Sequence, residues 1–266
     1  MPVECPISFR RVPDFEFGEI DRQVMACAYT AQNELGRLCE ERVYENEIAA
    51  RLKADDLIDV QTQVPIVVSF EGFTKTYRLD MVAGGLVYEL KVANNFTPAH
   101  DAQIYNYAAL LDLDRIKLIN LGMPQVEGRL RRCPFARIDR HKITVNRSRW
   151  NILSSSCEKL ASTSESILRD WGGFIDDRLM EEALVHFCGG ESTCAKRMPV
   201  ARNGTTLGHH RLLLHSPDVA FSVTAMGRDA SAHERQIRRL LNLLPLRGWQ
   251  WMNAHHTELR LTTIER

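Results

Sequence analysis

The sequence predicts an α/β protein in which one core unit occurs twice along the chain. Helical and strand-like apolar patterns alternate through residues 20–132. The segment 99–120 recurs at 232–253 without a gap and with eight of 22 positions identical. Unrelated helical sequence would give roughly one or two identities, so a duplicated unit is the better explanation. Within the first unit, charged side chains interrupt two apolar runs at Asp80, Glu89 and Lys91.

The first predicted element is a helix over residues 34–52, because Leu38, Val43, Ile48 and Leu52 recur near one face with Tyr44 beside them. Two strands follow around a Gly84-Gly85 turn, and the second of them spans 86–92. A hairpin through this turn brings Asp80 back beside that second strand.

Another helix opens at residues 97–103, with Thr97 as its N-cap and Pro98 at its first position. Gln103 and Tyr107 are four residues apart and share a face of this helix. The run 116–121 then reads as a short buried strand. The resulting order is helix, strand, hairpin strand, helix, strand.

The charged residues of the hairpin predict a site for a divalent cation. Side chains alternate along a strand, so Glu89 and Lys91 point to one face. Carboxylates converging on a sheet are costly to desolvate unless they bind a cation or one another. Two hard oxygen ligands suit Mg²⁺ or Mn²⁺, and a nearby lysine can orient an attacking water. Taken alone, the spacing equally describes an exposed edge strand with a Glu–Lys pair.

This element order and the Asp…Glu-x-Lys spacing resemble the restriction-endonuclease-like αβββαβ core of the PD-(D/E)xK nuclease superfamily, in particular its GxxExxY group. The resemblance covers residues 20–132. It implies that Asp80, Glu89 and Glu41 hold the metal and act in catalysis together with Lys91. It also places Tyr44, Gln103 and Tyr107 on the substrate side. One departure is visible, because Leu38 stands where the name-giving glycine is expected, although Gly36 comes just before it.

The overlay of the two halves predicts that the second copy has lost its chemistry. At an offset of 133, the positions of Asp80, Glu89 and Lys91 fall on a series of uncharged residues, namely Leu213, Ser222 and Thr224. Neutral residues suit a face that no longer binds a cation, because an unpaired charge there is costly. Asp177, opposite Glu41 at an offset of 136, is the one acidic survivor. The alternative is two unrelated α/β units that share a leucine-rich helix.

Between the copies lies a basic segment that begins near residue 129. Arg131, Arg132 and Arg137 are candidate contacts to the phosphate backbone of a nucleic acid. An ordinary solvated strand pair and linker explains the same pattern equally well. The predicted organisation is an N-terminal extension over 1–19, a nuclease-like domain over 20–145, a linker over 146–164 and a degenerate repeat over 165–266.

Composition fits a cytoplasmic protein without a membrane span. Lys and Arg together number 34, as do Asp and Glu, so the chain has no net positive charge of the kind that indicates nucleic-acid binding. The apolar stretches are too short to cross a bilayer, and residues 1–10 lack the apolar core of a signal peptide. The seven cysteines are scattered and form no CxxC pair, which favours reduced thiols.

Two hypotheses about function follow. The first is a metal-dependent nuclease that hydrolyses phosphodiester bonds in DNA or RNA. The alternative is a catalytically weak or inactive protein of nuclease fold that binds nucleic acid or acts as a scaffold. The sequence leaves the choice between DNA and RNA and the oligomeric state open.

Overall fold

The computed structural model describes residues 3–54, 58–133, 135 and 137–266, with residues 137 and 138 described by their backbone alone. The chain divides into two compact units, which are described separately. The N-terminal unit comprises Pro2–Ser69 and Thr74–Phe135, and the C-terminal unit comprises Phe70–Phe73 and Ala136–Arg266.

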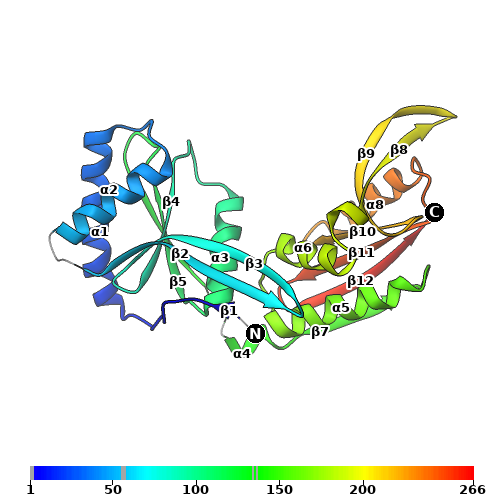
Figure 1. Ribbon diagram of the computed structural model, residues 1–266, viewed down its shortest axis with the longest axis horizontal. Helices are drawn as coiled ribbons and strands as arrows, with labels where there is room; N and C mark the ends of the chain where they lie inside the picture. The colour runs from blue at the N-terminus through cyan, green and yellow to red at the C-terminus, as the bar shows by residue number, and fades with distance from the viewer. Residues whose placement is uncertain (1–2, 55–57, 134, 136) are drawn as a thin grey trace. The chain divides into compact units, whose positions relative to one another are not determined.

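The N-terminal unit is a mixed six-stranded sheet with helices on both faces. Its elements are β1 (Val3–Glu4), α1 (Asp14–Leu35), α2 (Glu41–Ala54), β2 (Val60–Phe70), β3 (Phe73–Ala83), β4 (Leu86–Lys91), α3 (Pro98–Leu111), β5 (Arg115–Asn120) and β6 (Glu127–Arg132) (Figure 1). The strand order is β1-β2-β3-β4-β5-β6. The β4–β5 pair is parallel, whereas the pairs β1–β2, β3–β4 and β5–β6 are antiparallel. The main apolar core lies between the sheet and the helices α1 and α2.

The α/β core predicted for residues 20–132 is confirmed, with one change at its start. The expected continuous helix over 34–52 is two helices, because α1 ends at Leu35 and α2 begins at Glu41. Gly36 lies between them with a φ of +75°, a left-handed conformation that glycine adopts without strain. The chain therefore turns at Gly36, and α2 carries Glu41 in its first turn.

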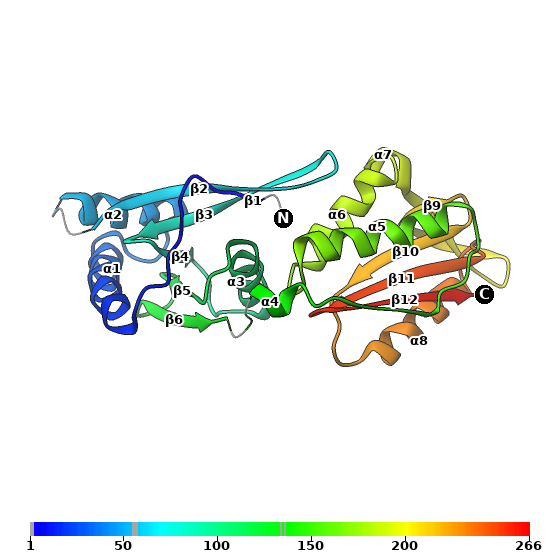
Figure 2. The ribbon, with the colours of Figure 1, turned by 90° about the horizontal axis from the view of Figure 1, so that it is seen from below.

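The C-terminal unit has a second six-stranded sheet. Its elements are α4 (Arg137–Arg140), β7 (Thr144–Arg149), α5 (Ser156–Trp171), α6 (Asp177–Phe187), α7 (Glu191–Cys194), β8 (Ala195–Arg202), β9 (Thr205–Ser216), β10 (Val219–Thr224), α8 (Ala230–Leu241), β11 (Gly248–His255) and β12 (Glu258–Glu265). The strand order is β7-β12-β11-β10-β9-β8. Helices α5 and α6 cover one face of this sheet and α8 covers the other (Figure 2).

Five strands of each sheet share their order, whereas the sixth differs, because β1 pairs antiparallel with β2 and β7 pairs parallel with β12. The directions of β3–β4, β4–β5 and β5–β6 match those of β9–β10, β10–β11 and β11–β12. The series α1, α2, β2, β3, β4, α3, β5, β6 corresponds to α5, α6, β8, β9, β10, α8, β11, β12. The central parallel pair even keeps its register, because Tyr88 lies opposite Lys117 and Phe221 lies opposite Gln250. Both pairs are related by the offset of 133 that the sequence overlay predicted.

An asparagine clamp at the end of the central strand also occurs in both units. The Asn120 side chain accepts a hydrogen bond from the backbone N–H of Ala93 at 3.1 Å and donates one to the Ala93 carbonyl at 2.8 Å. Asn253 makes the same two bonds to Met226, at 2.7 and 2.8 Å. A buried asparagine bound through both of its amide atoms fixes the chain where it leaves the sheet.

Two expectations about boundaries and alignment need correction. The predicted linker over 146–164 instead holds the end of β7 and the first half of α5, because β7 pairs with β12 and joins the second sheet. The overlay is also shifted by one residue on β9, where the register is irregular at the start of β10. The strand partner of Phe221 is Leu213, which therefore corresponds to Met81. The position of Asp80 accordingly falls on Leu212.

No helix in the described part of the chain is both long and apolar enough to cross a membrane. All seven cysteines are free in the structure, and four of them are buried.

Candidate functional site

Four of the predicted residues meet in the N-terminal unit around one ammonium group. The Nζ atom of Lys91 lies 2.8 Å from Glu89 Oε1, 3.8 Å from Asp80 Oδ2 and 3.9 Å from Glu41 Oε2. Asp80 comes from β3, Glu89 and Lys91 come from β4, and Glu41 comes from the first turn of α2. The hairpin expected from the sequence therefore brings Asp80 to the same cluster as Glu89 and Lys91.

Backbone groups hold the two outer carboxylates in place. The backbone N–H of Leu90 donates to Asp80 Oδ2 at 2.8 Å, and the N–H of Val92 donates to Glu41 Oε1 at 3.2 Å. The bond between Leu90 and Asp80 crosses the β3–β4 hairpin, which turns through Gly84 and Gly85 with φ values of +55° and +78°. Two successive left-handed residues are the requirement of a tight hairpin turn, and glycine meets it at little cost.

Glu89 is the most deeply buried member of the cluster. Only 1% of its side chain is exposed, and no donor among the described residues reaches its Oε2 atom. Burial, and then the charge of Asp80, raise the pKa of Glu89 to about 8. Burial also raises the pKa of Asp80, against the opposing attraction of Lys91. Burial alone would lower the pKa of Lys91, but the surrounding carboxylates outweigh it and the pKa is raised.

The cluster has the chemistry of a site for a hard cation. The donor set consists of carboxylate oxygens, and one of these oxygens is buried and unsatisfied. Among the residues that the structure describes, no group of three or more His, Cys, Asp or Glu side chains is arranged around a common metal position. Instead, the Lys91 ammonium lies among the carboxylates and balances part of their charge. Asp80, Glu89 and Glu41 supply the carboxylate oxygens of this cluster that could hold Mg²⁺ or Mn²⁺.

Gln103 and Tyr107 lie together beside this cluster. The Gln103 amide donates to the Tyr107 hydroxyl oxygen at 2.9 Å, which confirms that they share a face of α3. Burial, and then the negative charges of Glu89 and Asp80, raise the pKa of Tyr107. Tyr107 therefore remains a neutral hydrogen-bonding group close to the carboxylates.

Tyr44 has a different position from the one expected. Its side chain is fully buried in the core between the sheet and the first two helices. Its hydroxyl donates to the carbonyl of Gly36 at 2.6 Å, which ties α2 to the end of α1. A side chain without exposed surface cannot contact a substrate, so Tyr44 supports the turn that positions Glu41.

Two buried polar residues near the cluster were not anticipated as parts of the site. Glu45 lies one helical turn after Glu41 and accepts a hydrogen bond from Gln63 at 2.7 Å. Burial is the main cause of its raised pKa, and the charge of Asp80 contributes. Asn120, the residue of the clamp, was visible in the sequence as one of the eight identities in the overlay. Its position at the end of the strand was the signal that could have identified it.

The arginines predicted to contact phosphates have carboxylate partners. Arg131 forms a two-pronged pair with Asp101, at 2.7 and 3.0 Å, and Arg132 lies 3.4 Å from Asp14. The side chain of Arg137 lies outside the described residues. The charges of Arg131 and Arg132 are therefore partly balanced within the protein.

The equivalent face of the C-terminal unit is filled by tryptophans. Trp249 donates to the Ser222 hydroxyl and Trp251 donates to the Thr224 hydroxyl, each at 2.9 Å. Both indoles are buried in an apolar cluster that includes Leu212, the residue at the position of Asp80. Where the first unit gathers Asp80, Glu89 and Lys91, the second has apolar side chains and hydroxyl groups that are already bonded.

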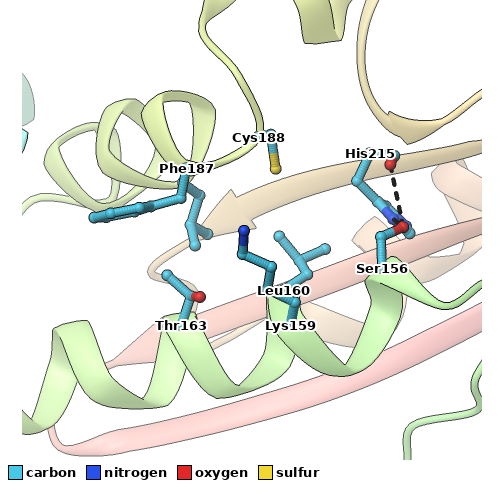
Figure 3. Close-up of a pocket in the computed structure, with 8 residues that line it drawn as sticks. Ser156, Lys159, Leu160, Thr163, Phe187, Cys188 and His215 are labelled. Carbon is cyan, nitrogen blue, oxygen red and sulfur yellow. Dashed lines mark hydrogen bonds between the residues drawn. The ribbon is translucent and has the colours of Figure 1, made fainter.

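The C-terminal unit also holds a cavity of about 200 Å³ between α5, α6 and β9 (Figure 3). The Ser156 hydroxyl is 2.8 Å from Nδ1 of His215, and burial lowers the pKa of that histidine to about 4. This cavity lies on the face of the sheet opposite α8. It is therefore not the counterpart of the Asp80 cluster.

The N-terminal unit thus places an aspartate on one hairpin strand, β3, and Glu-x-Lys on the next, β4. In agreement, residues 18–133 match the family model described as the PD-(D/E)XK nuclease superfamily. The match runs from α1 to the end of β6 and contains every residue of the cluster. The comparison with curated proteins and the comparison with solved structures each found no match.

Proposed function

We propose that the N-terminal unit is a metal-dependent nuclease of the GxxExxY type, and that the C-terminal unit is a degenerate copy of it. The observation that carries this proposal is the buried carboxylate of Glu89, for whose second oxygen no donor is found in the described part of the chain although Asp80 and Lys91 lie beside it. Burial raises the pKa of this carboxyl to about 8, so its ionised form is costly in a purely structural cluster and needs a compensating cation. The same oxygen is useful as a cation ligand.

Each residue of the cluster has a distinct role in this proposal. Asp80 and Glu89 would hold Mg²⁺ or Mn²⁺, which when bound would supply polarisation of the scissile phosphate and a lowered pKa of a water. Lys91 stays protonated, because the carboxylates raise its pKa, and so it donates hydrogen bonds instead of accepting a proton. It therefore orients the attacking water and stabilises the negative charge that develops on the phosphate. Glu41, about half exposed, completes the acidic rim.

The substrate is proposed to approach from the side of α3. The amide of Gln103 and the hydroxyl of Tyr107 are neutral groups beside the carboxylates and can bind phosphate or sugar oxygens. We also propose that Arg131, Arg132 and Arg137 contact the phosphate backbone of the nucleic acid outside the carboxylate cluster. Arg131 and Arg132 would have to exchange their carboxylate partners for phosphate.

The test is cleavage of single- and double-stranded DNA and RNA by the full chain, with Mg²⁺, Mn²⁺ or EDTA. We expect metal-dependent cleavage that Asp80→Asn abolishes, because the amide removes a charged ligand while keeping the shape. Ser222→Ala, at the position of Glu89 in the second unit, is the matched control and should cleave like the wild type.

The second candidate function is nucleic-acid binding without turnover. The observation that favours it is the tryptophan-filled face of the C-terminal unit, which shows that this fold persists without the charged cluster. Tight binding of nucleic acid with no cleavage of any substrate would replace the nuclease proposal by this one.

A further inference from the structure

The C-terminal unit concentrates positive charge that the composition of the whole chain hides. Residues 195–247 contain nine Lys and Arg side chains against three Asp and Glu, although the full chain has 34 of each class. These residues form the β8–β9 hairpin, β10, α8 and the turn that leads to β11. A protein of zero net charge can therefore still present a basic surface to a polyanion.

Most of this charge is not balanced locally. Within the described residues, Arg197, Arg202, Arg228, Arg235 and Arg239 are exposed and have no carboxylate partner. The arginines of β6 differ, because each of them is paired with an aspartate or a glutamate. Unpaired guanidinium groups bind phosphates without first breaking an internal ion pair.

An open hollow of about 520 Å³ lies where β8 meets the turn after α8. Arg202 and Arg266 line it together with the amide of Asn242. A hydrogen bond of 2.8 Å from the Ala201 N–H to the Leu243 carbonyl holds its two walls together. Guanidinium and amide groups offer several N–H donors, which suit the oxygens of a phosphate.

Helix α8, which ends at the hollow with its C-cap residue Asn242, presents further guanidinium groups. Arg235 and Arg239 are exposed and four residues apart, so they share the outer face of the helix. Ile237 and Leu241 face the sheet and hold α8 against it. The charged face is thus carried by a packed helix, and its direction is fixed within the C-terminal unit.

We propose that the C-terminal unit binds the phosphate backbone of nucleic acid through a surface made of Arg202, Arg235, Arg239 and Arg266, called here the α8 basic surface. The inference rests on the proposed function, because it assigns substrate binding to the unit without the carboxylate cluster. Contacts to phosphates carry no sequence information and gain affinity from the release of counterions. The α8 basic surface therefore supplies affinity that depends on salt and not on sequence.

The test is the salt dependence of binding to a fluorescent DNA duplex, measured by anisotropy in EDTA and in the Asp80→Asn background. The test variant carries Arg202→Gln, Arg235→Gln and Arg239→Gln. The control variant loses the same charge from exposed residues of the N-terminal unit, through Arg11→Gln, Arg22→Gln and Lys53→Gln. Each lost phosphate contact removes about 0.9 from the slope of log K against log salt.

We expect the slope to fall by about 2–3 in the test variant and to stay unchanged in the control. The affinity of the test variant for the duplex near physiological salt should fall by at least about tenfold. The same measurement with duplex RNA and with single strands identifies the nucleic acid that the protein prefers. Equal slopes in the two variants, or no binding by the wild type, overturn the proposal. If circular dichroism shows that the triple variant is unfolded, a double variant with Arg235→Gln and Arg239→Gln replaces it. Its slope of log K against log salt should fall by about 1–2.

Cleavage assays with Mg²⁺ separate this proposal from the nuclease proposal. An active nuclease with unchanged salt slopes overturns only the α8 basic surface. A reduced slope in a protein that cleaves nothing supports the surface and overturns the nuclease activity.

Discussion

Glu89→Gln removes a buried charge from the candidate metal site while keeping the shape of the side chain. Three carboxylates share the ammonium of Lys91 in this cluster, so one negative charge fewer relieves repulsion. The folded pKa of Glu89, about 8, lies above its ordinary value of 4.5. A carboxyl with a raised folded pKa contributes stability that is present below pH 4.5 and lost as the pH rises towards 8. The loss is on the order of 4 kcal/mol.

In EDTA, we therefore expect Glu89→Gln to be more stable than the wild type at pH 8, by up to about 4 kcal/mol, and to differ little at pH 5. Mn²⁺ at about 100 times its dissociation constant should stabilise the wild type by about 2.7 kcal/mol. That gain corresponds to about 5–10 °C in Tm for a chain of this size. The amide of the variant carries no charge, so Mn²⁺ should hardly stabilise it.

Differential scanning calorimetry at both pH values, with EDTA or Mn²⁺, measures these differences. Ser222→Ala is the matched control and should respond to metal like the wild type. A metal-free Glu89→Gln variant that is less stable than the wild type at pH 8 would refute the argument that the buried charge of Glu89 destabilises the fold. An equal gain from Mn²⁺ in the variant and the wild type would refute the assignment of Glu89 as a ligand.

Three further predictions follow. Lys91→Ala should keep most metal binding, measured by calorimetric titration, yet lower the cleavage rate by about 10²–10³ if its donor acts on the developing charge. Neutralising Arg131, Arg132 and Arg137 together should flatten the salt dependence of binding less than the α8 variant does, because Arg131 and Arg132 already have carboxylate partners. The low pKa of His215, about 4 against 6.5, means that the unfolded state binds more protons between these values. The contribution of His215 to stability should thus be full above pH 6.5 and fall by up to about 3 kcal/mol towards pH 4. Urea unfolding should show this loss as a pH-dependent difference between the wild type and His215→Gln, whereas His210→Gln should follow the wild type.

The parts of the site that depend on local pattern could be predicted from the sequence. Strand alternation placed Glu89 and Lys91 on one face, and the Gly84-Gly85 turn brought Asp80 beside them. Helical spacing likewise placed Gln103 next to Tyr107. These features require only neighbouring residues and a two-residue turn, so one sequence is sufficient to deduce them.

The features that depend on distant residues could not be predicted. The partner of Arg131 is 30 residues away and that of Arg132 is 118 away, so the sequence showed a basic run where the structure has ion pairs. The family resemblance placed Tyr44 on the substrate side, whereas packing turns its side chain into the core. The shift that exchanges Leu213 for Leu212 arises from a register irregularity, which no gapless overlay can show.

The tryptophans that fill the second sheet make the two units optically distinguishable. All four tryptophans of the chain lie in the C-terminal unit, at positions 150, 171, 249 and 251. Indole emission therefore reports on the C-terminal unit, with Trp171, Trp249 and Trp251 in buried, apolar surroundings. Unfolding of this unit should shift the emission to longer wavelength, whereas melting of the N-terminal unit alone should change circular dichroism and leave that emission in place. The natural chain thus contains its own fluorescent label for the unit without the carboxylate cluster.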